Sequence, residues 1–158
     1  MLRRLDKDIH SPKYVCPTDL HREHDRRQRE REEKAKRRKK AMEDEKHFHE
    51  LISKFFGICF TDDTIQVHVL ESVQEHLDEG VSMQHCVFDN AYYLKENSLI
   101  LSATIEGRRI ETIEVSLDTL KVVQSRGVCN KNTEYHKQIV SLINANRKLI
   151  RQRMRATA

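Results

Sequence analysis

Apolar and polar residues alternate in one part of the chain, and this alternation predicts the core of the fold. Residues 98–105 place apolar side chains at every second position, which is typical of a strand with one buried face. Similar β-rich runs occupy residues 55–60, 65–70, 109–115 and 120–125, and most are separated by short turns. We therefore expect an antiparallel meander sheet of about five strands.

A short amphipathic helix is predicted at residues 71–79, between the second and third of these runs. Gly80 is expected to end it, because glycine readily adopts the left-handed conformation found after a helix. Asp78 and Glu79 stand at the negative end of this helix, where a carboxylate is unfavourable. A basic partner is therefore expected nearby, and Arg126 is a candidate.

The last part of the chain, residues 133–154, predicts a second amphipathic helix. Its apolar residues recur at helical spacing and include Tyr135, Ile139, Leu142, Ile143, Leu149, Ile150 and Met154. Such a helix covers one face of a sheet, so the predicted fold class is α+β with two layers. His68, in the strand at residues 65–70, is expected on the solvent side of the sheet.

The first third of the chain has a different composition. Residues 18–54 contain no glycine or proline and are rich in strong helix formers, which favours one long charged helix. Apolar residues form no continuous stripe along it, and we expect only residues 47–52 to dock on the core. The predicted organisation is an irregular lead-in at residues 1–17, a basic, charged helix at residues 18–54 and a compact α+β domain at residues 55–158.

Charge is distributed unevenly along this helix. Between His21 and Lys40 eleven Lys or Arg residues face five Asp or Glu residues. Such a block attracts polyanions, so nucleic acid is the expected partner, with an acidic protein or an anionic membrane as alternatives. A solvated, salt-bridged helical spacer is the plainer interpretation. The residues expected to bind nucleic acid are Arg26, Arg27, Lys36, Arg37, Arg38, Lys39 and Lys40.

Several functional classes lack support in the sequence. The cysteines are Cys16, Cys59, Cys86 and Cys129, and none of them forms a C-x-x-C pair. The sequence also lacks nucleotide-binding glycine motifs and H-E-x-x-H, so we expect no cofactor and no metal ion. Without an apolar signal segment or a run of about 18 apolar residues, a cytoplasmic protein with reduced thiols and no membrane contact is expected.

Residues 80–93 contain the densest group of reactive side chains. His85 and Cys86 are adjacent, and adjacent side chains on a strand point to opposite sides, so a base for Cys86 would come from elsewhere. His136 is one candidate base, which Asp89 or Glu114 would orient. The alternative is that Cys86 is a small buried hydrophobic residue.

A second candidate site is the loop that begins at Arg126. Glycine permits close backbone approach and arginine binds phosphate through two hydrogen bonds, so Arg126, Gly127 and Asn130 fit an anion site. A turn stabilised by an arginine–carboxylate bridge is the alternative. The candidate catalytic residues are accordingly His85, Arg126, Asn130 and Cys86.

Five motifs in order carry a resemblance to a known family. They are CPTDL at residues 16–20 with His24 and Asp25, the segment from Glu79 to Val87, TIEV at residues 112–115, QSRG at residues 124–127, and Asn130. In these motifs the chain resembles the carboxy-terminal domain of the PcfJ-like proteins, which are encoded mainly on bacterial conjugative plasmids, transposons and related mobile elements. Residues 88–90 depart from the family pattern, in which a glycine and a tyrosine follow the His-Cys-Val motif. The resemblance implies a role in a mobile element, but no particular reaction, substrate or cofactor.

These observations favour a nucleic-acid-binding accessory protein of a mobile element. The basic helix would contact phosphate, and a pocket between His85 and Arg126 would hold a phosphate or a nucleotide. One alternative is an enzyme that acts on phosphodiester or nucleotide substrates with His85 and Arg126. Another is a non-catalytic interaction module that binds other mobile-element proteins.

Overall fold

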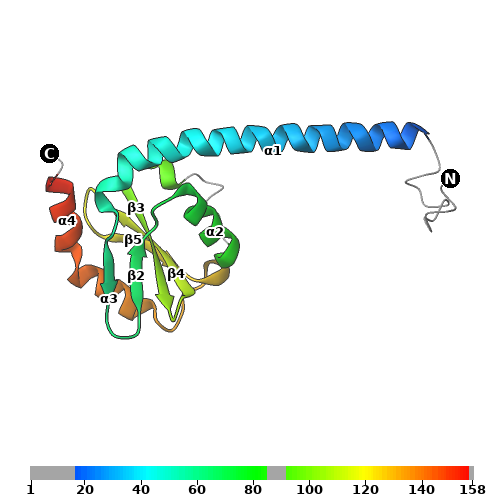
Figure 1. Ribbon diagram of the computed structural model, residues 1–158. Coiled ribbons are helices and arrows are strands. Elements are labelled where there is room, and N and C mark those ends of the chain that lie inside the picture. The colour runs from blue at the N-terminus through cyan, green and yellow to red at the C-terminus, as the bar shows by residue number, and fades with distance from the viewer. Residues whose placement is uncertain (1–16, 85–91, 157–158) are drawn as a thin grey trace. The chain divides into compact units, whose positions relative to one another are not determined.

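The computed structural model of the protein describes residues 17–84 and 92–156 (Figure 1). It has the predicted α+β fold with a five-stranded antiparallel sheet. The strands are β1 (Cys59–Thr61), β2 (Gln66–Val69), β3 (Ser98–Ile105), β4 (Arg108–Ser116) and β5 (Val122–Arg126). Their order in the sheet is their order in the chain, and every neighbouring pair is antiparallel. The predicted meander is therefore confirmed.

The long helix predicted from composition is α1 (Pro17–Ile52). Its 36 residues correspond to about 54 Å at 1.5 Å per residue. The chain divides into two compact units, Met1–Met42 and Glu43–Ala158, and α1 contributes to both. Within the second unit, Phe48 and Ile52 at the end of α1 are buried in the core, as expected from the apolar residues of that segment.

The predicted short helix is α2 (Val73–Met83), and it is longer than expected. The Ser72 hydroxyl accepts a hydrogen bond from the backbone N–H of Glu75, which fixes the first turn. Gly80 does not end the helix, contrary to the prediction. It is buried within α2, and the left-handed position falls at Gln84, with a φ of 52°. Burial of one helix face therefore outweighs the tendency of glycine to terminate a helix.

The apolar face of the sheet packs against α3 (His136–Ala145) and α4 (Arg147–Arg155). The sequence predicted one helix here, but the structure has two, separated at Asn146. The Asn146 side-chain amide donates a hydrogen bond of 2.7 Å to the carbonyl oxygen of Leu142. Asparagine side chains that bond nearby backbone groups compete with the helix, which explains the interruption.

The opposite face of the sheet is also covered, by α2, so the second unit has three layers where two were expected. This face carries polar side chains that are almost completely buried. They are Ser102, Thr104, Thr112 and Glu114, and α2 adds His76 and Glu79. Buried polar groups of this density require hydrogen-bond partners, and their partners define a candidate site.

His76 of α2 lies between two aromatic rings in the core. Its ring centroid is 5.1 Å from that of Phe48 and 5.7 Å from that of Tyr93, both in edge-to-face geometry. Its Nδ1 donates a hydrogen bond to the carbonyl oxygen of Ser72 at 2.8 Å, while Nε2 has no hydrogen-bond partner among the described residues. Burial lowers the pKa of His76 from 6.5 to about 4, and the hydrogen bond to Ser72 opposes this only partly.

Two further contacts fix the end of α1 to the second unit. The hydroxyl of Tyr93 donates a hydrogen bond to Asp44 at 2.9 Å, and the backbone N–H of Val73 donates one to Glu45 at 2.8 Å. Burial and the Asp44 carboxylate raise the pKa of Tyr93 to about 12. In the part of the chain that the structure describes, no helix is both long and apolar enough to cross a membrane.

Candidate functional site

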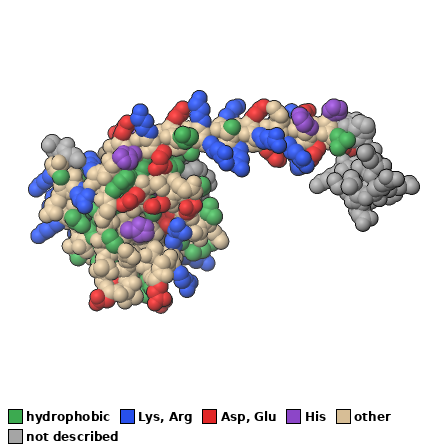
Figure 2. Space-filling view, viewed as in Figure 1, with side chains coloured by type: hydrophobic (Ala, Val, Ile, Leu, Met, Phe, Trp, Pro, Cys, Tyr) green, Lys and Arg blue, Asp and Glu red, His purple; other side chains and the backbone are tan. Residues whose placement is uncertain are grey.

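Every residue of α1 between Arg31 and Lys40 is exposed. Figure 2 shows Lys and Arg side chains along much of this helix. From Lys34 to Lys40 the sequence is KAKRRKK, with six cationic side chains and no carboxylate in seven residues. At 100° per residue, the five consecutive charges at residues 36–40, together with Lys34, surround the helix rather than forming one face. The segment is therefore a cationic cylinder, which we name the cationic segment (residues 34–40).

The nucleic-acid-binding residues predicted from sequence fall into two groups. Arg26 and Arg27 both contact Glu23, with N–O distances of 3.0 and 3.1 Å. Their hydrogen bonds and charges lower the pKa of Glu23 despite the opposing effect of desolvation. The other five are Lys36, Arg37, Arg38, Lys39 and Lys40, and none of them forms an ion pair within residues 17–84 and 92–156. These five are accordingly better placed to bind a phosphate.

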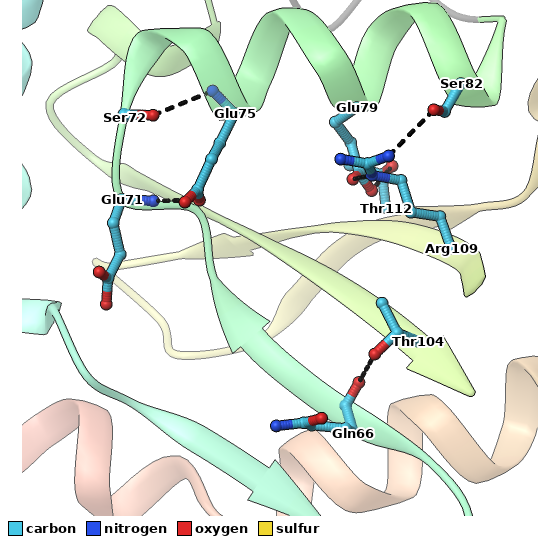
Figure 3. A network of polar contacts seen from close by, with 9 residues as sticks. All are labelled: Gln66, Glu71, Ser72, Glu75, Glu79, Ser82, Thr104, Arg109 and Thr112. Atoms are coloured by element: carbon cyan, nitrogen blue, oxygen red, sulfur yellow. Dashed lines mark hydrogen bonds and ion pairs between the residues drawn. The ribbon is translucent and has the colours of Figure 1, made fainter. Parts of the chain in front are cut away.

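A buried ion pair joins α2 to the polar face of the sheet (Figure 3). The Nε of Arg109 donates to one carboxylate oxygen of Glu79 at 2.8 Å, and the Thr112 hydroxyl donates to the other at 2.6 Å. Arg109 also donates to the hydroxyl of Ser82 at 3.0 Å. The side chain of Glu79 is completely buried, whereas that of Arg109 is 36% exposed. This arrangement corrects the sequence-based expectation that Arg126 is the basic partner of Glu79.

An irregularity in β4 positions Arg109. Ala103 pairs with Glu111, but the next residue of β3, Thr104, pairs with Arg109, so Ile110 is an extra residue in the ladder. Because of this bulge, Arg109 lies on the same face of the sheet as Thr112, three positions away. Bulges of this kind redirect side chains and are common beside functional sites.

The electrostatics of Glu79 follow from this environment. Burial raises its pKa, and the Thr112 and Ser102 hydroxyls together with the Arg109 guanidinium oppose the rise. A buried carboxylate with a raised pKa is a feature of acid–base sites, and also of structural ion pairs.

A cavity of about 410 Å³ lies beside this ion pair. Its lining includes Gln66 and His68 from β2, Thr104 from β3, and Glu79 and Arg109. His68, expected on the solvent side, is half-buried in this wall. The cavity therefore combines a histidine, a carboxylate and a guanidinium, a set capable of proton transfer and anion recognition.

A second buried carboxylate, Glu111, organises the loop before α3. It accepts hydrogen bonds from the Thr133 backbone N–H at 2.9 Å, the Thr133 hydroxyl at 2.7 Å and the Ser125 hydroxyl. The Nδ1 of His136 lies 3.0 Å from the same carboxylate. Desolvation tends to raise the pKa of Glu111, but these hydrogen bonds outweigh it and lower the pKa. Glu111 orients His136, whereas the sequence suggested Asp89 or Glu114.

The structure locates two of the four predicted catalytic residues. Arg126 is exposed at the end of β5 and donates a hydrogen bond to the side chain of Asn132. Asn130 is exposed in a short 3-10 helix, η4 (Val128–Asn130), with a φ of 61°. His85 and Cys86 lie outside the described residues, as does Asp89, so the catalytic assignment stays a prediction.

A hydrogen bond joins the end of α2 to the loop that follows β5. Cys129, in η4, donates a hydrogen bond of 3.1 Å from its thiol to the side-chain oxygen of Gln84, the last described residue before position 85. Cys59 and Cys129 are both free and exposed. No group of three or more His, Cys, Asp or Glu side chains suited to a metal ion occurs within the described ranges.

Sequence reasoning missed Arg109 and Glu111 as key residues of this unit. For Arg109 there was a partial indication, because the acidic end of α2 required a cation. For Glu111 the indication was a charged residue that alternation places on the same strand face as Ile113 and Val115, which marks a buried carboxylate with several partners.

Comparisons with known proteins agree with the resemblance carried by the sequence motifs. The family model described as PcfJ-like protein matches residues 1–140. No curated protein and no solved structure matches the chain. Since the family match covers most of the 158 residues, the chain belongs to the PcfJ-like protein family.

Proposed function

We propose that this protein binds nucleic acid as an accessory component of a mobile genetic element, and that the cationic segment of α1 contacts the phosphates. The observation that carries the proposal is the run of six exposed cations without a carboxylate between Lys34 and Lys40. Membership of the PcfJ-like family supports the mobile-element context through the sequence motifs described above.

The charge density of the cationic segment matches that of a nucleic acid. Seven helical residues extend about 10 Å, so the segment carries one charge per roughly 2 Å of axis. Double-stranded DNA carries one phosphate per about 1.7 Å of its axis. Neutralising these phosphates releases counterions, which makes binding favourable and strongly dependent on salt.

The two alternatives account less well for this segment. A salt-bridged spacer would pair its cations with carboxylates at i±3 or i±4, as Glu23 pairs with Arg26 and Arg27. Carboxylates such as Glu33 and Glu43 do stand at this spacing from residues of the cationic segment, but no ion pair with residues 34–40 forms in the described part of the chain. An acidic protein partner would satisfy the same charges, so experiment must separate it from nucleic acid. The enzyme prediction for His85, Cys86, Arg126 and Asn130 stays a separate prediction.

The test compares two variants that reverse the same number of charges. In the first, Arg37, Arg38, Lys39 and Lys40 are all replaced by Glu, which is an equally good helix former. In the control, Glu replaces Lys137, Lys148, Arg151 and Arg155, which are exposed and have no ion pair in the described part of the chain. Affinity for labelled double- and single-stranded DNA and RNA is measured by fluorescence anisotropy from 50 to 200 mM salt.

For the unmodified protein, six phosphate contacts predict a slope of about −5 in a plot of log affinity against log salt. The variant in α1 should reduce this slope by about 4, while the control keeps it. Equal losses in both variants would mean that net charge, and not the cationic segment, causes binding. Binding that is unchanged in the α1 variant would contradict the proposal. A partner that stays bound after nuclease treatment would favour the acidic protein instead.

A further inference from the structure

A second cationic surface is formed entirely by residues of the unit Glu43–Ala158. A cavity of about 410 Å³ is lined by Arg108 and Arg109 of β4 and by Lys131 of the loop that follows β5. Tyr135, Ile110 and Val128 provide the apolar part of its wall. The volume lies within the range of about 300–1,000 Å³ that is usual for small-molecule sites.

The cations of this cavity have unused hydrogen-bond donors. Arg108 and Lys131 are exposed and form no ion pair with any described carboxylate. Arg109 uses two of the five N–H groups of its guanidinium in hydrogen bonds to Glu79 and Ser82. One carboxylate, that of Glu134, lines the cavity, so three cations exceed it by two charges. A phosphate diester carries the charge and the acceptor oxygens that such donors bind.

The apolar wall suits a nucleobase. Tyr135 and Ile110 are partly buried against the core, and Val128 is 47% exposed. Aromatic rings beside cations are the usual means by which proteins bind single strands, because every base has a face that can stack. A base in a duplex is already stacked on its neighbours and is not available for such a wall.

The loop that carries Lys131 is held in place from two sides. The backbone N–H of Gly127 donates to the carbonyl oxygen of Lys131 at 2.7 Å, and a Cβ on Gly127 would lie 2.7 Å from the Thr133 methyl group. Glu111 fixes the other end of the loop through its two hydrogen bonds to Thr133. The backbone of the cavity wall is therefore ordered by packing before any ligand binds, which lowers the entropic cost of binding.

We propose that this cavity holds one nucleotide of a single-stranded nucleic acid, with its phosphate at Arg108, Arg109 and Lys131 and its base against Tyr135. The inference deepens the proposed function and rests on it for the class of partner. It adds a site that distinguishes single strands from duplexes, which the cationic segment alone does not do.

The experiment uses the full chain and a labelled deoxythymidine pentanucleotide, in fluorescence anisotropy titrations at several salt concentrations. Replacing Arg108 and Lys131 by Glu should weaken binding at least tenfold and reduce the salt slope by about 1.4, or 0.7 for each lost contact on a single strand. Tyr135→Leu should weaken binding about 5- to 100-fold without changing the slope, because stacking involves no counterion. Tyr135→Phe keeps the ring and should bind as the unmodified protein does.

Two controls separate this proposal from the one for α1. In the α1 variant with Glu at positions 37–40, Tyr135→Leu should weaken pentanucleotide binding by the same factor as in the unmodified protein, because stacking in the cavity does not involve the cationic segment. Lys137→Glu with Lys148→Glu reverses two charges elsewhere and should have no effect. Circular dichroism of Tyr135→Leu and Tyr135→Phe checks that both variants fold.

Each contrary outcome overturns the proposal for the cavity. An unchanged affinity of Tyr135→Leu would exclude stacking, and an unchanged affinity of the Arg108 and Lys131 variant would exclude the phosphate contact. Competition by thymidine monophosphate as strong as that by the unlabelled pentanucleotide would assign the cavity to a free nucleotide. If the pentanucleotide does not bind while a long duplex binds with the expected salt slope, the cavity proposal fails and the proposed function stands.

Discussion

The buried histidine of α2 predicts that the protein loses stability in mild acid. His76 is 1% exposed, and its pKa is lowered to about 4 from the ordinary 6.5. The folded state therefore binds fewer protons than the unfolded state between these two values. The stability that comes from a neutral His76 is fully present above pH 6.5 and is lost as the pH falls from 6.5 towards 4.

The size of the effect follows from the pKa difference. At pH 5 the side chain of His76 is protonated in the unfolded state and mostly neutral in the folded state. This pH lies 1.5 units below the pKa of the unfolded state. At 1.36 kcal/mol per unit this lowers the free energy of unfolding by about 2 kcal/mol relative to pH 8. With an m-value of about 2 kcal/mol/M, the urea midpoint should fall by about 1 M.

The assay is urea unfolding at pH 8 and pH 5, followed by near-UV circular dichroism of the tyrosines. His76→Leu and His76→Gln remove the titrating group while keeping similar volume and good helix propensity. In both variants the loss of stability between the two pH values should be about 2 kcal/mol smaller than in the unmodified protein. Other titrating groups are common to all three proteins and cancel in this comparison. A loss within about 0.5 kcal/mol of the unmodified protein's would refute the reasoning.

Three further predictions concern the polar contacts of the second unit, each measured by urea unfolding. Arg109→Met should lower the free energy of unfolding by about 2–3 kcal/mol at pH 7, because the Glu79 carboxylate stays buried without its cation. In the double variant that also carries Glu79→Gln, at least about 1 kcal/mol of this free energy should be recovered. Purely additive effects of the two substitutions would contradict an energetic coupling between Arg109 and Glu79. Because burial raises the Glu79 pKa, the loss in Arg109→Met should shrink as the pH is lowered towards 4.5. Glu111→Gln leaves four hydrogen-bond donors with one acceptor oxygen, so it should lower the free energy of unfolding by about 2–3 kcal/mol at pH 7. A decrease of less than about 0.5 kcal/mol would be inconsistent with the four hydrogen bonds of Glu111. Gly127→Ala places a methyl group too close to the Thr133 side chain and should lower the free energy of unfolding by about 1–3 kcal/mol. An unchanged urea midpoint would show that the loop can shift without loss of stability.

Features that depend on local sequence could be predicted well. The alternation in residues 98–105 covers the same residues as β3, and the stretch without glycine and proline at residues 18–54 corresponds closely to α1. These patterns depend on the strand period and on helix propensity, and residues that are close in the sequence determine both. The charge of the cationic segment likewise depends only on residues 34–40 and could be read directly from the sequence.

Features that depend on pairing between distant segments could not be predicted. Regular alternation along β4 would place Arg109 on the same face as Glu111 and opposite to Thr112. The bulge at Ile110 instead places Arg109 on the face of Thr112. A bulge adds one residue without changing the alternating pattern enough to be recognised. The need for a cation near Glu79 was recognised, but the candidate named from sequence was Arg126, and the partner in the structure is Arg109.

The interruption at Asn146 is an intermediate case. The apolar spacing continues through it, so periodicity alone favours one helix. At the break the Asn146 side chain bonds to the carbonyl oxygen of Leu142 and its backbone N–H to that of Ile143, and the sequence does not specify these local bonds.

The simple strand order of the sheet has a consequence for how the chain folds. Each strand pairs with the one synthesised just before it, so the sheet can grow strand by strand. The connection between β2 and β3 contains α2, whereas the other strands are joined by short turns, so loop-closure entropy is modest and such local topologies fold quickly. The helices that cover the apolar face are synthesised after all five strands. Until Ile139 and Ile143 arrive, Ile113 and Val115 lie on an uncovered surface, which makes the chain prone to aggregation at that stage. Truncation before α3 should therefore yield insoluble protein rather than a smaller folded domain.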